Sequence, residues 1–214
     1  MIFEKYNKDL SYSYVFGAFG TIELLNHKVK ECKAILVDPS FKDNEAYKKI
    51  HLICKQNNIP VIVDLKTISK IRDKGNIFVI GVFNKYTSSL SNNKHIVLNN
   101  INDVGSIGTI IRSMRGFSFE NLVLINCNVD LYHEHLIRST MGAFFSCNIS
   151  IFNTIEEYMR KYPNQNMYQI SKGGNDISTI NNNDNISLVF SSENIVNEKV
   201  IPIKFNEDIS LENI

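Results

Sequence analysis

The sequence lacks the features that mark membrane-spanning, secreted and zinc-stabilised proteins. No apolar run is long enough to cross a bilayer, and residues 1–8 lack the apolar core of a secretory signal peptide. The four cysteines are widely spaced and none belongs to a Cys-x-x-Cys pair, which disfavours both a structural zinc site and a disulfide framework. We therefore expect a cytoplasmic protein whose thiols are reduced and mostly buried.

Net charge is also nearly absent, at +1, but the charged residues are unevenly distributed. Residues 1–90 contain 14 lysines and arginines against 9 aspartates and glutamates, a balance of +5. Residues 91–214 contain 9 against 13, a balance of −4. A basic amino-terminal part is typical of a nucleic-acid-binding surface and equally of a solvated lysine-rich surface, so charge alone leaves both interpretations open.

Strands and helices are expected to alternate along the chain, and a polar stretch at residues 85–94 divides them into two segments. The first segment has predicted strands at 33–38, 60–64 and 77–80 and predicted helices at 21–29, 45–56 and 65–72. The second has predicted strands at 96–98, 122–125, 149–152, 167–170, 187–190 and 200–203 and predicted helices at 109–114, 132–140 and 154–161. This alternation predicts an α/β protein with a small, partly parallel sheet followed by a mostly parallel one.

The most informative stretch is residues 102–112, which join the strand at 96–98 to the helix at 109–114. Its glycines predict a loop whose backbone N–H groups are free and aimed at a ligand. Arg112, expected on the first turn of the helix, would add a permanent charge suited to phosphate or to a developing oxyanion. A surface ion pair is the alternative interpretation of this arginine.

Ligands of open α/β sheets bind outside the carboxyl ends of the strands. We therefore expect residues 102–108 and the residues that follow Phe190 and Ile203 to lie at one edge of the second sheet.

Two further groups of residues could carry function but have simpler interpretations. The aromatic side chains near the amino terminus could stack on bases, yet their dense spacing is more typical of a core: Tyr12, Tyr14, Phe16 and Phe19. His133 and His135 could bind a metal, but helical residues two apart point to different sides, so we predict no metal site.

Four stretches, in order along the chain, resemble the motifs of one family. Residues 103–112 (DVGSIGTIIR) are similar to D-P-x-N-x-G-x-x-x-R, and residues 137–144 (IRSTMGAF) contain a sequence similar to R-x-S-x-G-A. Residues 188–193 (LVFSSE) are similar to an apolar strand followed by G-x-E-G, and residues 201–203 (IPI) with 210–211 (SL) are similar to I-P-M…S-L-N. The chain thus resembles the SpoU/TrmH family of RNA 2′-O-ribose methyltransferases, which have the knotted SPOUT α/β fold.

The resemblance implies an RNA-selecting substrate-binding domain at residues 1–88 and a Rossmann-like, mostly parallel SPOUT methyltransferase domain at residues 95–214. It implies transfer of a methyl group from S-adenosylmethionine to a ribose 2′-hydroxyl of RNA, with ribosomal RNA favoured over transfer RNA. It also implies a homodimer and no membrane partner.

The resemblance assigns catalytic roles to Arg112, Glu193 and Ser106. Because a guanidinium stays protonated, we expect Arg112 to hold an RNA phosphate and to stabilise the oxyanion rather than to act as a base. Glu193 would position the ribose or Arg112, although a solvated loop acid is the alternative. Ser106 would leave room for a ligand and hydrogen-bond to it.

The remaining assignments are binding residues. Backbone groups of Ser191, Ile201 and Leu211 would contact the cofactor. Arg138 and Ser139, together with Arg112, would contact RNA, and Arg138 and Ser139 would also pack within the knot domain.

The sequence departs from the family motifs where the cofactor would bind. Serine stands where the family has asparagine at Ser106 and glycine at Ser191, nine residues separate Ser191 from Ile201, and the chain stops at Ile214, where the family continues into a final helix. One alternative is therefore a catalytically inactive RNA-binding protein derived from this family. Another is a nucleotide-binding α/β protein unrelated to RNA.

Overall fold

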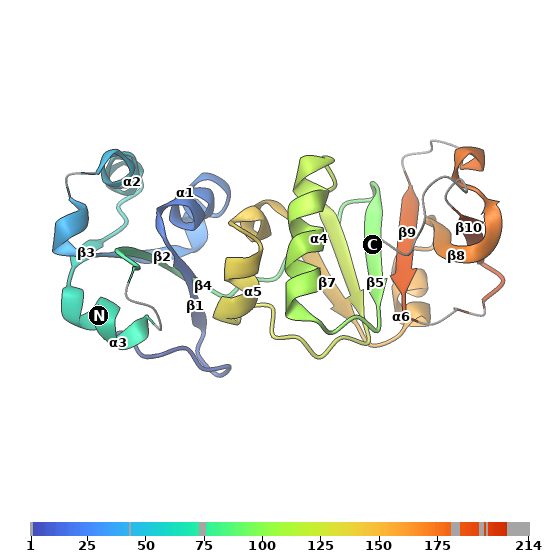
Figure 1. Ribbon diagram of the computed structural model, residues 1–214, viewed down its shortest axis with the longest axis horizontal. Coiled ribbons are helices and arrows are strands. Elements are labelled where there is room, and N and C mark those ends of the chain that lie inside the picture. Colours follow the sequence, from blue (N-terminus) through green and yellow to red (C-terminus); the bar gives the residue numbers. More distant parts are fainter. Residues whose placement is uncertain are drawn as a thin grey trace. The chain divides into compact units, whose positions relative to one another are not determined.

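A computed structural model describes residues 2–42, 44–72, 76–180, 185–192, 195 and 197–204 (Figure 1). The chain forms two compact units, which we call the mixed-sheet unit and the parallel-sheet unit. The mixed-sheet unit comprises residues 1–86, 103–116 and 129–147, and the parallel-sheet unit comprises residues 87–102, 117–128 and 148–214. No helix in the described ranges is long and apolar enough to span a bilayer.

The mixed-sheet unit contains a four-stranded sheet in the order β1-β4-β2-β3. Strand β4 is antiparallel to β1 and β2, and β2 is parallel to β3. The strands are β1 (Tyr12–Phe16), β2 (Cys32–Val37), β3 (Val61–Val63) and β4 (Val79–Asn84). The helices are α1 (Ala18–His27), α2 (Glu45–Gln56), α3 (Leu65–Ile71), α4 (Val104–Gly116) and α5 (Glu134–Ser139), with short 3-10 helices η1 (Val29–Glu31), η2 (Pro39–Phe41) and η3 (Ala143–Ser146). The predicted small, partly parallel sheet is confirmed.

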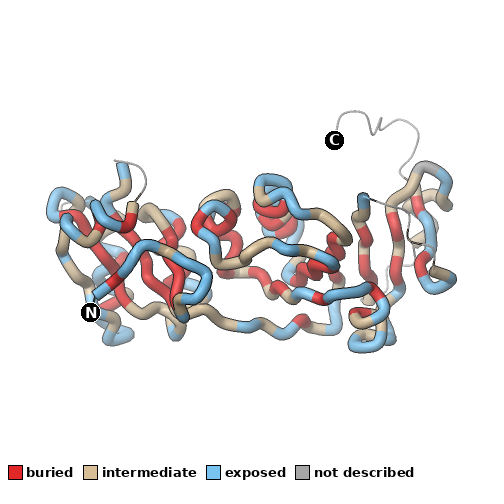
Figure 2. The backbone as a smooth tube through the Cα atoms, turned by 90° about the horizontal axis from the view of Figure 1, so that it is seen from below, coloured by how far each residue is buried: buried red, intermediate tan, exposed pale blue. Residues whose placement is uncertain are grey.

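Successive side chains along the strands point to opposite faces of this sheet, so an apolar core lies on each face. Leu36 packs with Ile68 of α3, whereas its neighbours Ile35 and Val37 pack in a separate cluster with Ile50 of α2. Figure 2 shows the strands as the most continuously buried parts of the chain. The sheet is thus covered by α3 on one face and by α1 and α2 on the other (Figure 1).

The parallel-sheet unit contains six strands in the order β10-β8-β9-β5-β6-β7, and every neighbouring pair is parallel. The strands are β5 (His95–Asn99), β6 (Asn121–Ile125), β7 (Asn148–Phe152), β8 (Asn166–Asp176), β9 (Ile186–Ser191) and β10 (Val200–Lys204), and the helices are α6 (Ile155–Lys161) and the 3-10 helix η4 (Ile177–Thr179). Every predicted strand of the second segment is present, so the mostly parallel sheet is confirmed.

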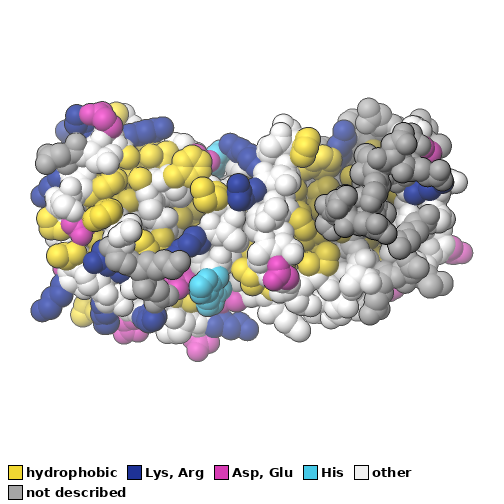
Figure 3. Space-filling view, viewed as in Figure 1, with side chains coloured by type: hydrophobic (Ala, Val, Ile, Leu, Met, Phe, Trp, Pro, Cys, Tyr) yellow, Lys and Arg dark blue, Asp and Glu magenta, His cyan; other side chains and the backbone are white. Residues whose placement is uncertain are grey.

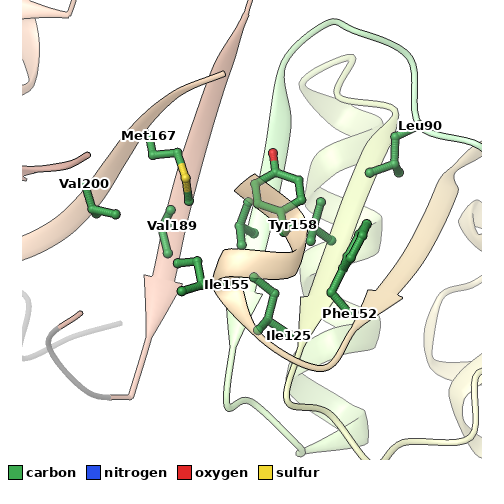
Figure 4. Packing of buried hydrophobic residues seen from close by; sticks show 10 residues of the cluster. Leu90, Ile125, Phe152, Ile155, Tyr158, Met167, Val189 and Val200 are labelled. Carbon is green, nitrogen blue, oxygen red and sulfur yellow. The ribbon is translucent and has the colours of Figure 1, made fainter. Parts of the chain in front are cut away.

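Helix α6 covers one face of this sheet. The Thr154 hydroxyl accepts a hydrogen bond from the Glu157 backbone N–H, which caps the helix as its sequence predicts. The helix then directs Ile155 and Tyr158 into a cluster that includes Val189 of β9 and Phe152 of β7 (Figure 4). Burying these apolar side chains holds the helix against the strands.

A buried polar network closes the amino end of the parallel strands. His95, fully buried, lies 2.7 Å from the Ser91 carbonyl oxygen through Nε2 and 2.7 Å from the Tyr158 hydroxyl through Nδ1. A carbonyl can only accept, so in the neutral ring Nε2 carries the proton and Tyr158 donates to Nδ1. Tyr158 is also 2.6 Å from the Ser187 hydroxyl. Burial lowers the pKa of His95, while the Ser91 carbonyl opposes this shift in part.

Lowering the pH through the ordinary histidine range, near 6.5, is expected to reduce the free energy of unfolding. His95 stays neutral in the folded protein because its pKa is depressed, whereas the unfolded chain binds a proton there. Urea unfolding at pH values above and below this range measures the effect. His95→Gln should lower stability at the higher pH and remove this part of the pH dependence. An unchanged dependence in the variant would contradict the assignment.

The expected burial of the cysteines is confirmed in part. None of the four, all of which lie in described ranges, forms a disulfide; Cys54 and Cys147 are buried, and Cys32 and Cys127 are partly buried. Burial raises the pKa of Cys54 to about 11 and of Cys32 to about 12, so both are protonated near neutral pH.

Candidate functional site

The carboxyl edge of the parallel sheet brings polar residues of three connections together. Asn99, the last residue of β5, pairs in register with Ser191, the last residue of β9. The Asn99 amide donates to the Ser191 hydroxyl at 2.9 Å, and the Asn100 amide donates to the Ser192 hydroxyl at 3.2 Å. Ser191 and Ser192, which follow Phe190, therefore lie beside Asn99 and Asn100 at the end of β5. The expected place of residues 102–108 and of the residues after Ile203 at the same edge stays a prediction.

Two asparagines turn the chain at this edge. Asn100 and Asn126 follow β5 and β6 with left-handed backbone angles of φ 58° and 50°, which asparagine tolerates better than most residues. Their N–H groups donate to the carbonyls that end the neighbouring strands, at Ile125 (2.9 Å) and Phe152 (3.1 Å). The Asn128 N–H then donates to the Asn102 side chain at 2.9 Å. These asparagines were not among the predicted site residues, although an asparagine directly after a buried strand indicates such a turn.

The structure does not bring the predicted cofactor residues Ser191 and Ile201 close together. Ile201 in β10 pairs with Tyr168 in β8, which pairs with Leu188 in β9. Ile201 thus lies two strands away from β9, roughly 10 Å across the sheet. It is also three residues before Ser191 in register, roughly 10 Å along the strands. One ligand could touch both only by extending across the sheet. Glu193 and Leu211 lie outside the described residues.

Helix α4 begins earlier than the sequence analysis predicts. It starts at Val104, so residues 104–108 are helical and the predicted glycine loop is wrong. The Asp103 carboxylate accepts a 2.6 Å hydrogen bond from the Ser106 N–H, and bonds from Ser106 and Gly105 lower the pKa of Asp103. A protein carboxylate therefore occupies the place where free N–H groups were expected to bind an anion.

Arg112 consequently lies on the third turn of α4, not the first. It is exposed, and no residue in the described ranges bonds to its side chain, so the alternative of a surface ion pair has no support there. Ser106 and Thr109 precede it at three-residue spacing on the same exposed surface of α4. Helical side chains tilt toward the amino end, which brings the guanidinium back toward this row. The row offers one fixed cation to a ligand. Its two hydroxyls remain as acceptors, because Thr109 Oγ1 donates to the Gly105 carbonyl at 3.0 Å and the Ser106 side chain bonds to Asp103.

The motif glycine of α4 has a packing role. A Cβ on Gly108 would lie 1.9 Å from the Ser139 hydroxyl oxygen and 2.5 Å from its Cβ, so α4 and α5 touch there through backbone. Ser139 itself donates to the Leu136 carbonyl at 2.8 Å. Arg138 stacks on Phe16, with its guanidinium carbon 5.0 Å from the ring centre. Ser139 thus packs against α4, whereas Arg138 packs on Phe16, which lies in residues 1–88 and not in the domain expected at residues 95–214. The RNA contacts of both residues stay a prediction.

His133 and His135 do not point to different sides, so that expectation is wrong. His133 precedes α5 as its cap, and its Nδ1 accepts from the His135 N–H at 3.2 Å. The two rings stack with centroids 5.1 Å apart. Within the described ranges, no three histidine, cysteine, aspartate or glutamate residues are grouped to hold a metal ion.

The aromatic cluster near the amino terminus is only partly core. Tyr12 and Tyr14 are buried as expected, and the Tyr14 hydroxyl donates to the Glu4 carbonyl. Phe19, however, is 61% exposed, so its expected place in the core is wrong. The strand ends at Phe16 and the chain enters α1 at Ala18, which changes the side-chain period and turns Phe19 outward.

Residues 93–196 match the family model described as the SpoU rRNA Methylase family. This match covers β5 to β9 and includes α4 with Arg112. Residues 93–196 belong to the SpoU family. A comparison with curated proteins finds no match.

Solved structures share the fold of this chain at low sequence identity. An AdoMet-bound rRNA methyltransferase from Sinorhizobium meliloti aligns with a TM-score of 0.72 and 19% identity over 94% of this chain and 80% of that one. The SpoU methyltransferase AviRb from Streptomyces viridochromogenes, in complex with AdoMet, aligns with a TM-score of 0.72 and 13% identity over 94% of this chain and 83% of that one. A structure described as an RNA 2′-O ribose methyltransferase aligns with a TM-score of 0.67 and 15% identity over 91% of this chain and 79% of that one. The α/β fold with its amino-terminal part is therefore that of SpoU methyltransferases.

The described edge of the sheet fits S-adenosylmethionine in its chemistry. Amide and hydroxyl groups, which suit ribose hydroxyls and an adenine edge, end β5 and β9 at Asn99 and Ser191. Among described groups, the Asn99 side-chain oxygen accepts no hydrogen bond. These neutral donors and acceptors could hold the nucleoside part of the cofactor.

Proposed function

We propose that this SpoU chain transfers a methyl group from S-adenosylmethionine to a ribose 2′-hydroxyl of RNA, with ribosomal RNA favoured over transfer RNA. The observation that carries the proposal is the family match over residues 93–196, within which the motif arginine, Arg112, is exposed and unpaired among described groups. The relatives described as rRNA and RNA 2′-O ribose methyltransferases support the same substrate class.

Arg112 would act on the RNA. Its guanidinium can bind a backbone phosphate through two parallel hydrogen bonds, which orients the neighbouring ribose. As the 2′-hydroxyl loses its proton, the same fixed charge stabilises the oxygen that forms the new bond. Ser106 would hydrogen-bond to the ribose, and Glu193 would position the ribose or Arg112.

The cofactor would be held by the parallel-sheet unit. The backbone of Ser191 and the side chain of Asn99 would bind it at the end of β9 and β5. Backbone groups of Ile201 would contact it only where the ligand extends across the sheet, and Leu211, outside the described residues, stays a predicted contact. When bound, S-adenosylmethionine supplies an activated methyl group for in-line displacement. Much of the rate enhancement then comes from orientation, which can contribute roughly 7–11 kcal/mol. We also propose that the protein acts as a homodimer in the cytoplasm.

Titration calorimetry with S-adenosylmethionine tests the cofactor half of the proposal. We expect saturable heat with a dissociation constant in the micromolar range, and a several-fold weaker constant for Asn99→Ala. Gln165→Ala is the control, because Gln165 bonds at the opposite, amino end of the strands. No heat at millimolar ligand would instead favour an inactive RNA-binding protein derived from this family.

RNA binding at increasing salt tests the other half. A protein that neutralises phosphates with arginine and lysine loses affinity steeply as salt rises. Affinity that does not depend on salt would favour a nucleotide-binding protein unrelated to RNA.

A further inference from the structure

A second arginine lies next to Arg112 on helix α4. Arg115 follows Arg112 by three residues, and side chains at this spacing on a helix are neighbours, with roughly 5–6 Å between their Cβ atoms. Both arginines are exposed. They come four and seven residues after Gly108, so they share with it the face of α4 that meets α5 at Ser139. The two guanidinium groups therefore belong to one surface.

Arg115 reaches across this surface to helix α1. Its Nη2 atom lies 3.4 Å from Nε2 of His27, the last residue of α1, and Nε2 is also 3.4 Å from a carboxylate oxygen of Glu23. A guanidinium can only donate, so in this contact His27 accepts through an unprotonated Nε2, which then cannot donate to Glu23. A neutral imidazole thus orients the Arg115 side chain toward α1 without removing its charge. Figure 3 shows lysine or arginine side chains at the surface between the parts of the chain that carry α1 and α4.

The positive charge of this pair is not neutralised by the protein. Among the described residues, no carboxylate forms an ion pair with Arg112 or Arg115, and the ion pair of Glu23 is with His27. Like charges at neighbouring positions of a helix destabilise it, so the pair is unfavourable in the free protein. An anionic ligand with two negative charges at similar spacing would remove this repulsion.

The charge of the whole unit favours the same kind of ligand. The mixed-sheet unit, which contains both arginines, has 17 lysines and arginines against 12 aspartates and glutamates, a net of +5. The parallel-sheet unit has 6 against 10, a net of −4. A polyanion is therefore attracted to the unit that carries the pair.

We propose that Arg115 binds a second phosphate of the RNA, next to the phosphate bound by Arg112, so that one strand runs along this face of α4 toward α1. This rests on the proposed function, because it takes RNA as the substrate and Arg112 as a phosphate ligand. A nucleic-acid strand carries one negative charge per nucleotide, and two long side chains from neighbouring helix positions can reach consecutive charges. Phosphate contacts fix the register and orientation of a strand and carry no base sequence. Arg115 would therefore position the RNA and not select its bases.

Binding of a fluorescently labelled RNA oligonucleotide at several salt concentrations tests this contact. Arg115→Ala is expected to weaken binding about three- to tenfold at low salt and to reduce the slope of log affinity against log salt by about one. In single-turnover methylation of ribosomal RNA, the variant should need proportionally more RNA for half-saturation, with the rate at saturating RNA within about twofold of wild type. Arg115→Lys should retain most of the affinity, because an ammonium group also binds phosphate as a point charge.

A control variant and a double variant test whether the effect is local. Lys55→Ala removes the same charge from an exposed position in the last turn of α2, in the same unit, and should change affinity by less than about twofold. His27→Ala removes the contact that orients Arg115, so it should weaken binding about twofold in the wild-type background and have no effect in the Arg115→Ala background.

Four results would contradict the second phosphate contact. Equal losses in Arg115→Ala and Lys55→Ala would mean that the net charge of the unit attracts RNA, without a role for this pair. Unchanged affinity and salt dependence in Arg115→Ala would refute the contact and leave the proposed function standing. A wild-type protein that binds RNA at no salt concentration would refute both together. A large fall in the melting temperature of Arg115→Ala would assign the arginine to holding α4 against α1 instead.

Discussion

Arg112→Ala is expected to lower the rate of RNA methylation by about a hundred- to a thousandfold, with almost no change in melting temperature. The loss is large because the guanidinium would stabilise charge that develops only as the 2′-oxygen reacts. Stability should hold because the side chain is exposed and bonds to no described residue. Single-turnover methylation of RNA, alongside thermal unfolding, measures both quantities.

Two further variants test whether activity depends on the planar donors of Arg112 as well as its charge, and whether it depends on this position. Arg112→Lys keeps the charge but loses the planar pair of donors, so its activity should fall between wild type and the alanine variant. Arg160→Ala removes an equally exposed arginine from α6 and should leave activity unchanged. Proportional losses of stability and activity in Arg112→Ala would instead mean that the arginine is structural.

Gly108→Ala is expected to destabilise the protein by about 2–3 kcal/mol, although alanine is the better helix former. The added methyl group would overlap the Ser139 side chain, and both helices would have to move apart. For a chain of this length the melting temperature should fall by roughly 4–12 °C. Thermal and urea unfolding measure the change.

The matched control lies on the same helix. A Cβ at Gly116 meets nothing within 4 Å, so Gly116→Ala should leave stability unchanged or slightly raised. The double variant Gly108→Ala/Ser139→Gly should recover part of the loss, because it removes the atoms that overlap while a backbone contact at 3.1 Å remains. A Gly108→Ala protein as stable as wild type would show that α4 and α5 do not touch through this glycine.

The sequence predicted the strands well, except β1 (Tyr12–Phe16), because most of them carry a local hydrophobic signal. The buried runs in β5, β6 and β9 need no tertiary information to be recognised. The start of α4 was mistaken although its signal is also local: Asp103 is a good helix cap, and the glycines after it were interpreted as a loop. The glycines were misinterpreted because their function is not local: Gly108 is needed for packing against Ser139, which is thirty-one residues away in sequence.

The candidate site was harder to predict because its parts depend on long-range pairing. That Asn99 meets Ser191 follows from the pairing of β5 with β9, which no local pattern in the sequence indicates. The separation of Ile201 from Ser191 follows from β10 pairing with β8 at the sheet edge, where the register shifts after Pro202. The exposure of Phe19 likewise depends on what packs around α1. Local periodicity carries none of this information.

The most direct test of the account is methyl transfer itself, with the product located on the RNA. The protein would be incubated with methyl-labelled S-adenosylmethionine and ribosomal RNA, and the RNA would then be hydrolysed with alkali. A methylated 2′-oxygen cannot attack the adjacent phosphate, so we predict label in alkali-resistant dinucleotides, and its loss in Arg112→Ala. Label confined to mononucleotides, or no transfer at all, would contradict a ribose 2′-O-methyltransferase.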